Sequence, residues 1–383
     1  MSSPVRVSAS VSSAERPTAA EIDLVALSHN YREVVRLARG RHVLAVVKAQ
    51  AYGHGAVPVA RRLVEDGAHM LGVATVEEGC ELRASGIAAP ILVMGPLFPE
   101  QAGTIVSHGL TPVLYSPALA RALSQAAVQG SKTVAVHVKI DTGMGRIGLP
   151  PEEAVRFVGG LASFPGIVPE GLMTHFADAD LREKAFAKLQ MDRFEAVIDS
   201  LREKGIDVPL RHAANSAAVL EYDRALLTMV RPGLMLYGYD PLERRGSADL
   251  RPVLSWRTRI AYVKRVAAGT PVSYGRTFVT SRQSLIATIP VGYADGFGRS
   301  LSNRGEALVG GRRVPVAGRV CMDMTMLDVT DVPGVEEGDE VVLIGAQGGE
   351  RITADDLAAQ SGTIAYEVLC AIGGRVPRVV KFS

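Results

Sequence analysis

The stretch HVLAVVKAQAYGHG, residues 42–55, decides the expected fold. Its first seven residues are apolar except at their ends, so they predict a buried strand at residues 42–48 that ends in a lysine. A turn containing two glycines follows, and residues 56–66 then carry apolar side chains at helical spacing. A strand, a turn and an amphipathic helix in this order form one βα unit.

The same unit recurs along the first two thirds of the chain. Apolar and β-branched runs predict eight strands, at residues 42–48, 70–74, 91–94, 111–114, 133–140, 167–173, 209–212 and 227–231. Amphipathic stretches of helical length lie between them, for example at residues 56–66, 77–84, 152–162 and 183–204. Most gaps leave room for a crossover helix, so the strands are expected to be parallel. Eight units in about 230 residues favour a (β/α)8 barrel over an open doubly wound sheet.

The pattern changes after Pro252. Short runs separated by glycine and proline predict strands at residues 257–266, 285–291, 307–309, 313–316, 324–329 and 340–344, with one clear helical stretch at 354–367. The expected fold class is therefore α/β, with a (β/α)8 barrel at residues 21–251 followed by a mainly β C-terminal domain at residues 252–383.

Composition narrows the class of protein. The chain has 383 residues, 47% apolar and 21% charged, with a formal net charge of +2, which is typical of a globular protein in water. Dispersed Lys and Arg give no reason to expect nucleic acid, and no apolar run approaches the roughly eighteen residues that a bilayer requires. Three distant cysteines fit neither a disulfide framework nor a metal site and indicate a cytoplasmic protein. Residues 1–20, rich in Ser and Ala, predict a disordered tail.

In barrels of this kind, functional side chains follow the C-terminal ends of the strands. Lys48 ends the first predicted strand. Desolvation there favours the neutral amine, which is the form that makes a Schiff base with an aldehyde. A lysine that only packs its stem at the strand end and extends its amine to water remains the alternative.

The loops after the last two predicted strands read HAANSAA (212–218) and RPGL (231–234). Such loops commonly bind phosphate, and Asn215 and Ser216 could begin a helix whose free amides favour an anion, although plain capping is the alternative. A Schiff-base lysine and a phosphate site in one barrel mouth indicate pyridoxal phosphate. Arg231 would then keep the cofactor's ring nitrogen unprotonated, which suits removal and return of one α-proton. Alone, Arg231 could equally form a salt bridge at a strand end.

Two cations flank the loop after the fifth predicted strand. Arg146 suits bidentate binding of a carboxylate, and Lys139 would be repelled by it unless something neutralised the amine. His175, after the sixth strand, could be a ligand, a base or a hydrogen-bonded ring. Asp178 and Asp180 lie near it in sequence, but no second histidine completes a metal site, so no metal is expected.

The string GMGRIG, residues 143–148, fits the glycine pattern of a dinucleotide site. In that site the helix begins within the glycine run, whereas here Pro150 and Pro151 place the helix start after it. This interpretation is rejected.

Nine strings, in the same order as in the family, resemble alanine racemase. They are AVVKAQAYGHG (45–55), HVKIDTGMGRIG (137–148), THF (174–176), HAANSAA (212–218), VRPGLMLYG (230–238), VSYGRTF (272–278), VGYADG (291–296), CMDMTM (321–326) and YEVLCAIGGRVPR (366–378). The resemblance implies a homodimer whose active sites combine the barrel mouth of one subunit with the β domain of the other.

The matching motifs also imply roles for individual residues. Lys48 would hold pyridoxal phosphate and act as base for the D-enantiomer, while Tyr274 of the partner subunit would act as base for the L-enantiomer. Arg231 would face the ring nitrogen, and His175 would link it to Tyr274. The implied cofactor-binding residues are Lys48, Tyr52, His175, Asn215, Ser216, Arg231, Gly233, Leu234 and Tyr366, and the implied substrate-binding residues are Arg146, Met322 and Tyr293.

Two further positions stand out against the family. Lys139 matches a lysine that is carbamylated in many members, and the modification would turn a competing cation into an anion that orients Arg146. Gln50 stands where the family usually has Asn or Asp, and a longer side chain would reshape the pocket if it orients the loop.

The implied function is interconversion of L- and D-alanine by two-base proton transfer on an external aldimine, supplying D-alanine for peptidoglycan. Three alternatives stay open. A racemase for serine or a broader range of amino acids would share all these motifs. A pyridoxal-phosphate-dependent decarboxylase would be expected to set a carboxylate against the ring nitrogen, where Arg231 stands. A non-catalytic protein that binds the cofactor would need only the barrel.

Overall fold

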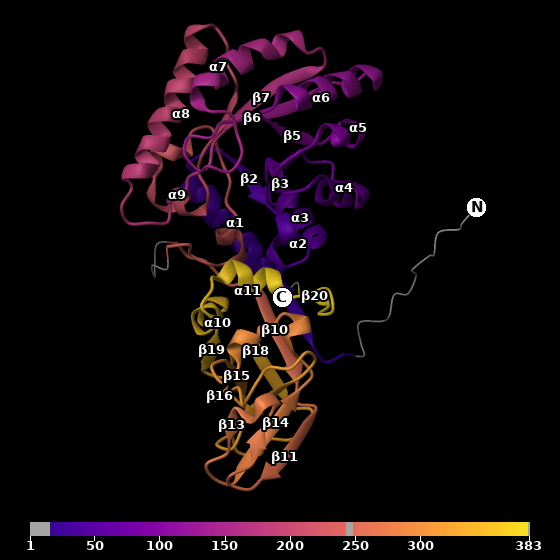
Figure 1. Ribbon diagram of the computed structural model, residues 1–383, viewed down its shortest axis with the longest axis vertical. Coiled ribbons are helices and arrows are strands. Elements are labelled where there is room, and N and C mark those ends of the chain that lie inside the picture. Colours follow the sequence, from indigo (N-terminus) through magenta and orange to yellow (C-terminus); the bar gives the residue numbers. More distant parts are fainter. Residues whose placement is uncertain (1–15, 243–247, 382–383) are drawn as a thin grey trace, which may run out of the picture. The chain divides into compact units, whose positions relative to one another are not determined.

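The computed structural model describes residues 16–242 and 248–381 (Figure 1). They divide into two compact units. The barrel unit comprises Asp23–Val253, and the β unit joins the described residues up to Ile22 with Leu254–Val380.

The barrel unit is built on an eight-stranded parallel sheet in the order β8-β7-β6-β5-β4-β3-β2-β9. The strands are β2 (His42–Val46), β3 (Met70–Val73), β4 (Ile91–Val93), β5 (Thr111–Leu114), β6 (Val134–Lys139), β7 (Ile167–Met173), β8 (Leu210–His212) and β9 (Met229–Val230). The backbone N–H of Thr228 donates to the carbonyl of Arg211 at 3.1 Å, and that of Arg231 donates to Ala214 at 2.8 Å. These bonds join β9 to the chain around β8, so the sheet is nearly closed and the expected fold class is confirmed.

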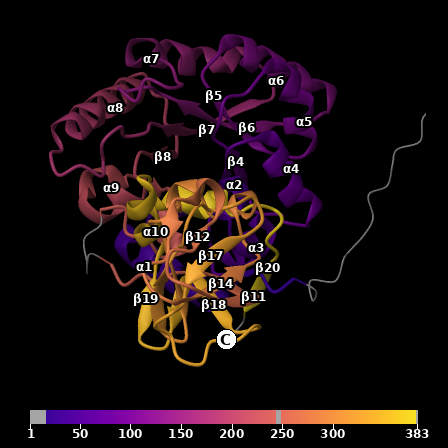
Figure 2. The same ribbon diagram turned by 60° about the horizontal axis from the view of Figure 1, so that its bottom comes forward.

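Helices cover the outside of this sheet, and Figure 2 shows α4–α8 arranged around β4–β8. The helices are α1 (Leu24–Ala38), α3 (Ala56–Glu65), α4 (Val76–Ala84), α5 (Ala102–Ser107), α6 (Pro117–Gln129), α7 (Pro151–Gly160), α8 (Ala185–Glu203) and α9 (Ser216–Glu221), whereas α2 (Lys48–Tyr52) is a short turn with left-handed backbone. In α3 the buried side chains are Ala56, Val59, Ala60 and Leu63, which lie on one face because Val59 and Ala60 are three and four residues after Ala56 and Leu63 is three and four residues after them. Because helices and barrel interior cover the two faces of the sheet, several of its strands are continuous apolar runs, as in β3, where every residue is buried.

The β unit contains a main sheet in the order β16-β15-β18-β10-β1-β20, with β19 paired to β18. A three-stranded sheet, β11-β14-β17, and the pair β12-β13 complete it. The elements are β1 (Ala19–Asp23), β10 (Leu254–Arg259), β11 (Tyr262–Val266), β12 (Pro271–Val272), β13 (Phe278–Val279), β14 (Ser284–Ile289), β15 (Glu306–Val309), β16 (Arg312–Pro315), β17 (Thr325–Asp328), β18 (Glu340–Gln347), β19 (Glu350–Ile352), β20 (Arg378–Lys381), α10 (Ala354–Ser361) and α11 (Ala365–Ala371).

The expected disordered tail at residues 1–20 is wrong for residues 16–20; residues 1–15 lie outside the described chain. Strand β1 pairs with β10 in antiparallel register, and Ala20 and Ile22 are fully buried. Arg16 lies 2.9 Å from the buried carboxylate of Asp295. Residues 21 and 22 therefore belong with the β unit rather than with the barrel. No local pattern could show this, because the partner strand lies more than 230 residues away in the sequence.

Two expected elements of the β domain are each divided in the structure. The run at residues 257–266 spans parts of β10 and β11, which belong to different sheets. The helical stretch at 354–367 becomes α10 and α11, because Gly362 ends α10 in a left-handed conformation at φ 74°. Within the described ranges, the structure contains no helix with both the length and the apolar character to cross a membrane.

Candidate active site

The C-terminal ends of the barrel strands bring together candidate residues from distant parts of the sequence. Lys48 follows β2, Lys139 ends β6, His175 follows β7 and Arg231 follows β9. Because all eight strands are parallel, these four residues lie toward the same end of the barrel.

Lys48 opens a left-handed turn, which is rare for residues other than glycine. The φ and ψ angles are 52° and 53° at Ala49, 53° and 45° at Gln50, and 52° and 53° at Ala51, and φ at Tyr52 is also 52°. Such a conformation costs roughly 1–2 kcal/mol per residue, because the Cβ atom approaches the following carbonyl oxygen. Strained backbone of this kind persists only where surrounding contacts hold it, and it concentrates at functional sites.

Arg231 is a buried cation with only 4% of its surface exposed. One terminal nitrogen donates to Nδ1 of His212 at 2.9 Å. The other donates to the carbonyls of Thr174 at 2.7 Å and Ala213 at 3.1 Å, and to Nδ1 of His175 at 3.3 Å. None of these acceptors is a carboxylate. Burial accordingly lowers the pKa of Arg231 to about 9.

The histidine beside Arg231 begins a chain of hydrogen bonds through the barrel interior. His212 Nε2 lies 2.7 Å from His137 Nδ1, and His137 Nε2 lies 3.2 Å from a carboxylate oxygen of Glu170. An arginine can only donate, so Nδ1 of His212 accepts, and each ring then donates from Nε2 to the next group. Both histidines are therefore neutral. In agreement, burial is the largest influence lowering the pKa of His212 and of His137.

His175 has its protonation set by the same arginine. Its Nδ1 accepts from Arg231, which leaves the proton on Nε2. Burial first, and then the charges of Arg231 and Lys139, hold the pKa of His175 well below its usual value. A neutral imidazole with a proton on Nε2 can donate a hydrogen bond to an anion.

Lys139 is buried, with 4% of its surface exposed. Burial lowers its pKa to about 7, and the positive charges of Arg231 and Arg146 act in the same direction. Asp141 opposes the shift but does not cancel it. Near neutral pH a large share of this amine is therefore uncharged and nucleophilic.

The residues expected to form the phosphate site lie close together. Ser216 Oγ accepts from the backbone N–H of Gly233 at 2.9 Å and of Met235 at 3.4 Å. A Cβ atom on Gly233 would lie 2.5 Å from the hydroxyl of Tyr52, so only glycine fits there without displacement of that ring. Leu234 begins the short helical turn Leu234–Tyr237 directly after it.

Asn215 has a structural role that the sequence also allowed. Its side-chain oxygen accepts from the backbone N–H of Ala218 at 3.0 Å and so caps α9. This contact is the helix capping that the sequence analysis gave as the alternative to anion binding.

The remaining candidates belong to the β unit. Tyr274 is 70% exposed, Met322 is 52% exposed and Tyr293 is 41% exposed. The backbone N–H of Tyr293 donates to the carbonyl of Cys321 at 3.0 Å, and that of Ala294 donates to the carbonyl of Met322 at 3.1 Å. These bonds bring the backbone at Tyr293 close to that at Met322. Tyr366 lies on α11. These large apolar side chains thus lie on the surface of a single chain.

Ser273 places Tyr274. It has a positive φ of 66°, and its hydroxyl donates to the carbonyl of Arg319 at 2.6 Å. The short helical turn Tyr274–Arg276 follows at once, so the tyrosine is presented from a constrained loop.

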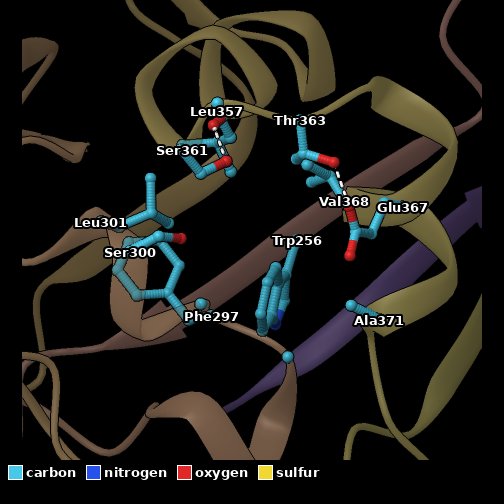
Figure 3. Close-up of a pocket in the computed structure, with 13 residues that line it drawn as sticks. Trp256, Phe297, Ser300, Leu301, Leu357, Ser361, Thr363, Glu367, Val368 and Ala371 are labelled. Carbon is cyan, nitrogen blue, oxygen red and sulfur yellow. Dashed lines mark hydrogen bonds between the residues drawn. The ribbon is translucent and has the colours of Figure 1, made fainter.

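The β unit also contains a cavity of about 290 Å³, shown in Figure 3. Trp256 and Phe297 contribute aromatic walls, and Thr363 donates to Glu367 at its rim. None of its thirteen lining residues is among the expected site residues. The candidate site is therefore defined by the strand ends of the barrel and not by this cavity.

Sequence reasoning missed His137, His212 and Glu170 as members of the site. Each lies within a predicted strand, on β6, β8 and β7. A polar residue inside an otherwise apolar barrel strand was the available signal, because such a group needs a buried partner. Among the described residues, no group of three or more His, Cys, Asp or Glu side chains is arranged to hold a metal ion.

Two family models cover the chain. Residues 22–241 match the alanine racemase N-terminal domain, and residues 253–380 match the alanine racemase C-terminal domain. The chain belongs to the alanine racemase family. The resemblance seen in the sequence is confirmed, and the chain is an enzyme of the isomerase class.

Individual relatives agree with the family models. An alanine racemase of Halothermothrix orenii is 50% identical over 368 residues, which are 96% of this chain and 97% of that protein. The structure of alanine racemase from Clostridium difficile 630 superposes with a TM-score of 0.92 at 38% identity, covering 96% of both chains. The Bacillus anthracis alanine racemase with bound L-Ala-P gives a TM-score of 0.89 at 38% identity, covering 96% of this chain and 95% of that one. Alanine racemases as a family depend on pyridoxal phosphate.

Proposed function

We propose that this racemase interconverts L- and D-alanine, with pyridoxal phosphate bound at the mouth of the barrel unit. The observation that carries the proposal is the environment of Arg231: a buried guanidinium at the C-terminal end of the barrel whose hydrogen-bond acceptors, within the described part of the chain, are all neutral. The product D-alanine is a precursor of peptidoglycan, so the enzyme acts in the cytoplasm as a supplier of cell-wall material.

The residues of the barrel mouth fit this cofactor. Lys48 provides the amine for covalent attachment, and the Gly233 backbone, with no Cβ, leaves room beside the Tyr52 hydroxyl. Ser216 holds the loop that contains Gly233. The residues that would hold the phosphate are Tyr52, Asn215, Ser216, Gly233, Leu234 and Tyr366. Bound pyridoxal phosphate supplies an aldehyde that joins the substrate's amino group and a conjugated ring that acidifies its α-proton.

Arg231 limits the reaction to proton transfer. The cationic guanidinium of Arg231 would oppose protonation of the cofactor's ring nitrogen, because two adjacent positive charges repel each other. With that nitrogen unprotonated, the bound cofactor would withdraw electrons weakly, which suits a proton that is removed and promptly returned. A carboxylate at this position, as expected for a decarboxylase, would have the opposite effect.

Two bases act on opposite faces of the substrate. The amine of Lys48 removes the α-proton of D-alanine, and the phenolate of Tyr274 removes that of L-alanine. Each returns a proton in the opposite direction as its conjugate acid. Neutral His175 donates from Nε2 to the Tyr274 oxygen and so stabilises the phenolate. The positive charge of Arg231, which donates to Nδ1 of the same ring, adds to this stabilisation.

The substrate carboxylate binds to Arg146, with the backbone of Met322 and the side chain of Tyr293 completing its site. Carbamylation converts Lys139 from a cation into an anion, which pairs with Arg146 and orients it. The lowered pKa of Lys139, about 7, supplies the neutral amine that this modification requires.

The enzyme works as a homodimer, in which Tyr274, Met322 and Tyr293 act in the partner's site. Their exposure in the single chain supports this arrangement, because large apolar side chains that lie exposed on one chain are typical of a surface that another protein chain covers. Two copies related by a twofold axis would bury these side chains reciprocally.

A mixing experiment tests both the bases and the shared site. Tyr274→Phe and Lys48→Ala homodimers should each lose activity by at least about a hundredfold, because each lacks one base. After the two are unfolded and refolded together, about a quarter of the wild-type activity should return, because half of the dimers are mixed and each mixed dimer has one complete site. Mixtures that stay inactive although mixed dimers have formed would show that the two bases do not act across the dimer.

The substrate is tested separately. Wild-type enzyme is incubated with each L-amino acid, and chiral chromatography follows the D-enantiomer. Alanine should give the highest kcat/KM. A comparable value for serine would identify the enzyme as a racemase of broader range, and release of carbon dioxide would identify a decarboxylase.

A further inference from the structure

We propose that Glu78 is a positioning residue for Lys48, acting through the left-handed turn that Lys48 opens. The inference rests on the proposed catalytic role of Lys48. Glu78 lies in the first turn of α4, outside the sequence motifs that define the site.

Both oxygens of the Glu78 carboxylate are engaged with backbone. One accepts from the N–H of Ala49, the residue directly after Lys48, at 2.6 Å. The other accepts from the N–H of Ala74 at 2.7 Å and of Thr75 at 3.3 Å. A single carboxylate thus joins the end of β2 to the end of β3. Hydrogen bonds to an ionised carboxylate are short and strong, and three of them define its position.

The turn after Lys48 needs such support. Four consecutive non-glycine residues have φ between 52° and 53°, where the backbone energy is higher than in the right-handed helical or extended regions. Without supporting contacts, the turn would relax toward one of those regions. The Ala49 amide is the first peptide group of this turn, so its bond to Glu78 fixes the direction in which the backbone leaves Lys48. Release of that bond would let the Lys48 amine move relative to the substrate's α-carbon, and proton transfer depends steeply on that geometry.

Gln50 provides a second connection from the same turn. Its side-chain nitrogen donates to Glu81 at 2.9 Å, one helical turn beyond Glu78, and its side-chain oxygen accepts from the N–H of Ala56 at 3.2 Å. The amide therefore joins the turn to both α4 and α3. This gives the departure at position 50 a structural meaning, because an asparagine there is one methylene shorter and cannot keep both contacts without a shift of the turn.

The first test uses the protein without its cofactor. Glu78→Gln keeps the size of the side chain but replaces one acceptor oxygen with a donor group, so it cannot accept all three bonds. Glu77→Gln is the matched control, since Glu77 is the neighbouring carboxylate in the same helical turn and the substitution removes the same charge. Hydrogen exchange of the peptide covering residues 48–55 should accelerate about tenfold in Glu78→Gln and remain at the wild-type rate in Glu77→Gln. Equal exchange in the two variants would overturn the inference.

The second test reads the Lys48 step in the loaded enzyme. Glu78→Gln should lower kcat about tenfold with a small change in KM, because the substrate-binding residues remain. The isotope effect with α-deuterated D-alanine should rise, because removal of that proton by Lys48 becomes slower, while the effect with α-deuterated L-alanine should fall. A general loss of stability or cofactor would lower both rates without separating the two isotope effects.

Glu78→Asp serves as the second variant if Glu78→Gln fails to fold, because it keeps the charge but is one methylene too short to reach Ala49 and Ala74 together. It should shift exchange and isotope effects in the same directions, and wild-type values of both would overturn the inference. The outcome is distinct from failure of the proposed function. Racemisation by Lys48→Ala would overturn the role of Lys48, whereas the exchange experiment on cofactor-free protein tests the contact itself.

Discussion

The guanidinium of Arg231 donates to Nδ1 of His212 at 2.9 Å, and this contact sets the protonation of the barrel interior. The proton of His212 is therefore on Nε2, which donates a hydrogen bond to Nδ1 of His137. His137 in turn donates from Nε2 to the carboxylate of Glu170. A cation at the barrel mouth is thereby connected to a carboxylate within β7 through two neutral rings.

Substitution of His212 by phenylalanine tests this chain of hydrogen bonds. His212→Phe leaves a buried N–H of Arg231 and Nδ1 of His137 without partners, so the free energy of unfolding should fall by about 1–3 kcal/mol. His108→Phe is the control, because His108 is an exposed ring at the end of α5, and its effect should stay within about 0.5 kcal/mol. Urea denaturation measures both, and equal midpoints and slopes would contradict the relay.

The buried amine of Lys139 should make stability depend on alkaline pH. Its pKa is about 7 in the folded protein against 10.5 ordinarily, so between these values the unfolded chain binds more protons. The free energy of unfolding therefore increases as the pH rises from 7 to 10.5, with a slope of at most about 1.4 kcal/mol per pH unit. Below pH 7 the amine is charged in both states, and the destabilisation that it causes is at its largest. Unfolding of wild type and Lys139→Met in buffer free of carbon dioxide measures it. Parallel curves for the two proteins would refute the shift.

The same amine should react with carbon dioxide. The neutral nitrogen attacks the carbon atom, one proton is released, and a carbamate forms. Wild-type protein equilibrated with ¹³C-labelled bicarbonate should show a carbamate resonance that is missing from Lys139→Met. Acidification should remove the signal, since carbamates lose carbon dioxide when protonated. A resonance that persists in Lys139→Met would assign the modification to another amine.

Gly233 should be required for retention of the cofactor. Gly233→Ala sets a Cβ atom 2.5 Å from the Tyr52 hydroxyl. Tyr52 is only 7% exposed and its ring centroid lies 4.9 Å from that of Tyr237, so the ring cannot easily move aside. Pyridoxal phosphate should therefore be lost more readily on dialysis, as measured by the absorbance that remains. Gly103→Ala, in a helix with no neighbour within 4 Å of the new atom, should retain cofactor like wild type.

Much of the barrel was predictable because its strands follow a local rule. The expected strands at residues 111–114 and 167–173 coincide with β5 and β7. Short runs made mostly of apolar residues arise where a strand is largely buried on both faces, and amphipathic helices between them indicate parallel order. Lys48, Lys139 and Arg231 were found by the same logic, because they stand at or directly after strand ends.

Other features depended on groups that are far apart in sequence. Strand β1 is placed by β10, and nothing in residues 16–20 distinguishes an ordered strand from a tail. The left-handed turn after Lys48 opposes the intrinsic preference of Ala49 and Gln50, so propensity alone predicts the wrong backbone.

The amino-acid sequence by itself determined the alternation of strand and helix and the chemistry available at the strand ends, since periodicity and residue type are local properties. Only the tertiary structure decided which proton each histidine carries, why Lys139 gives up its charge, and how Glu78 reaches Ala49. These depend on burial and on contacts between segments brought together by folding, and the free energy of a charge or a hydrogen bond is set by that surrounding.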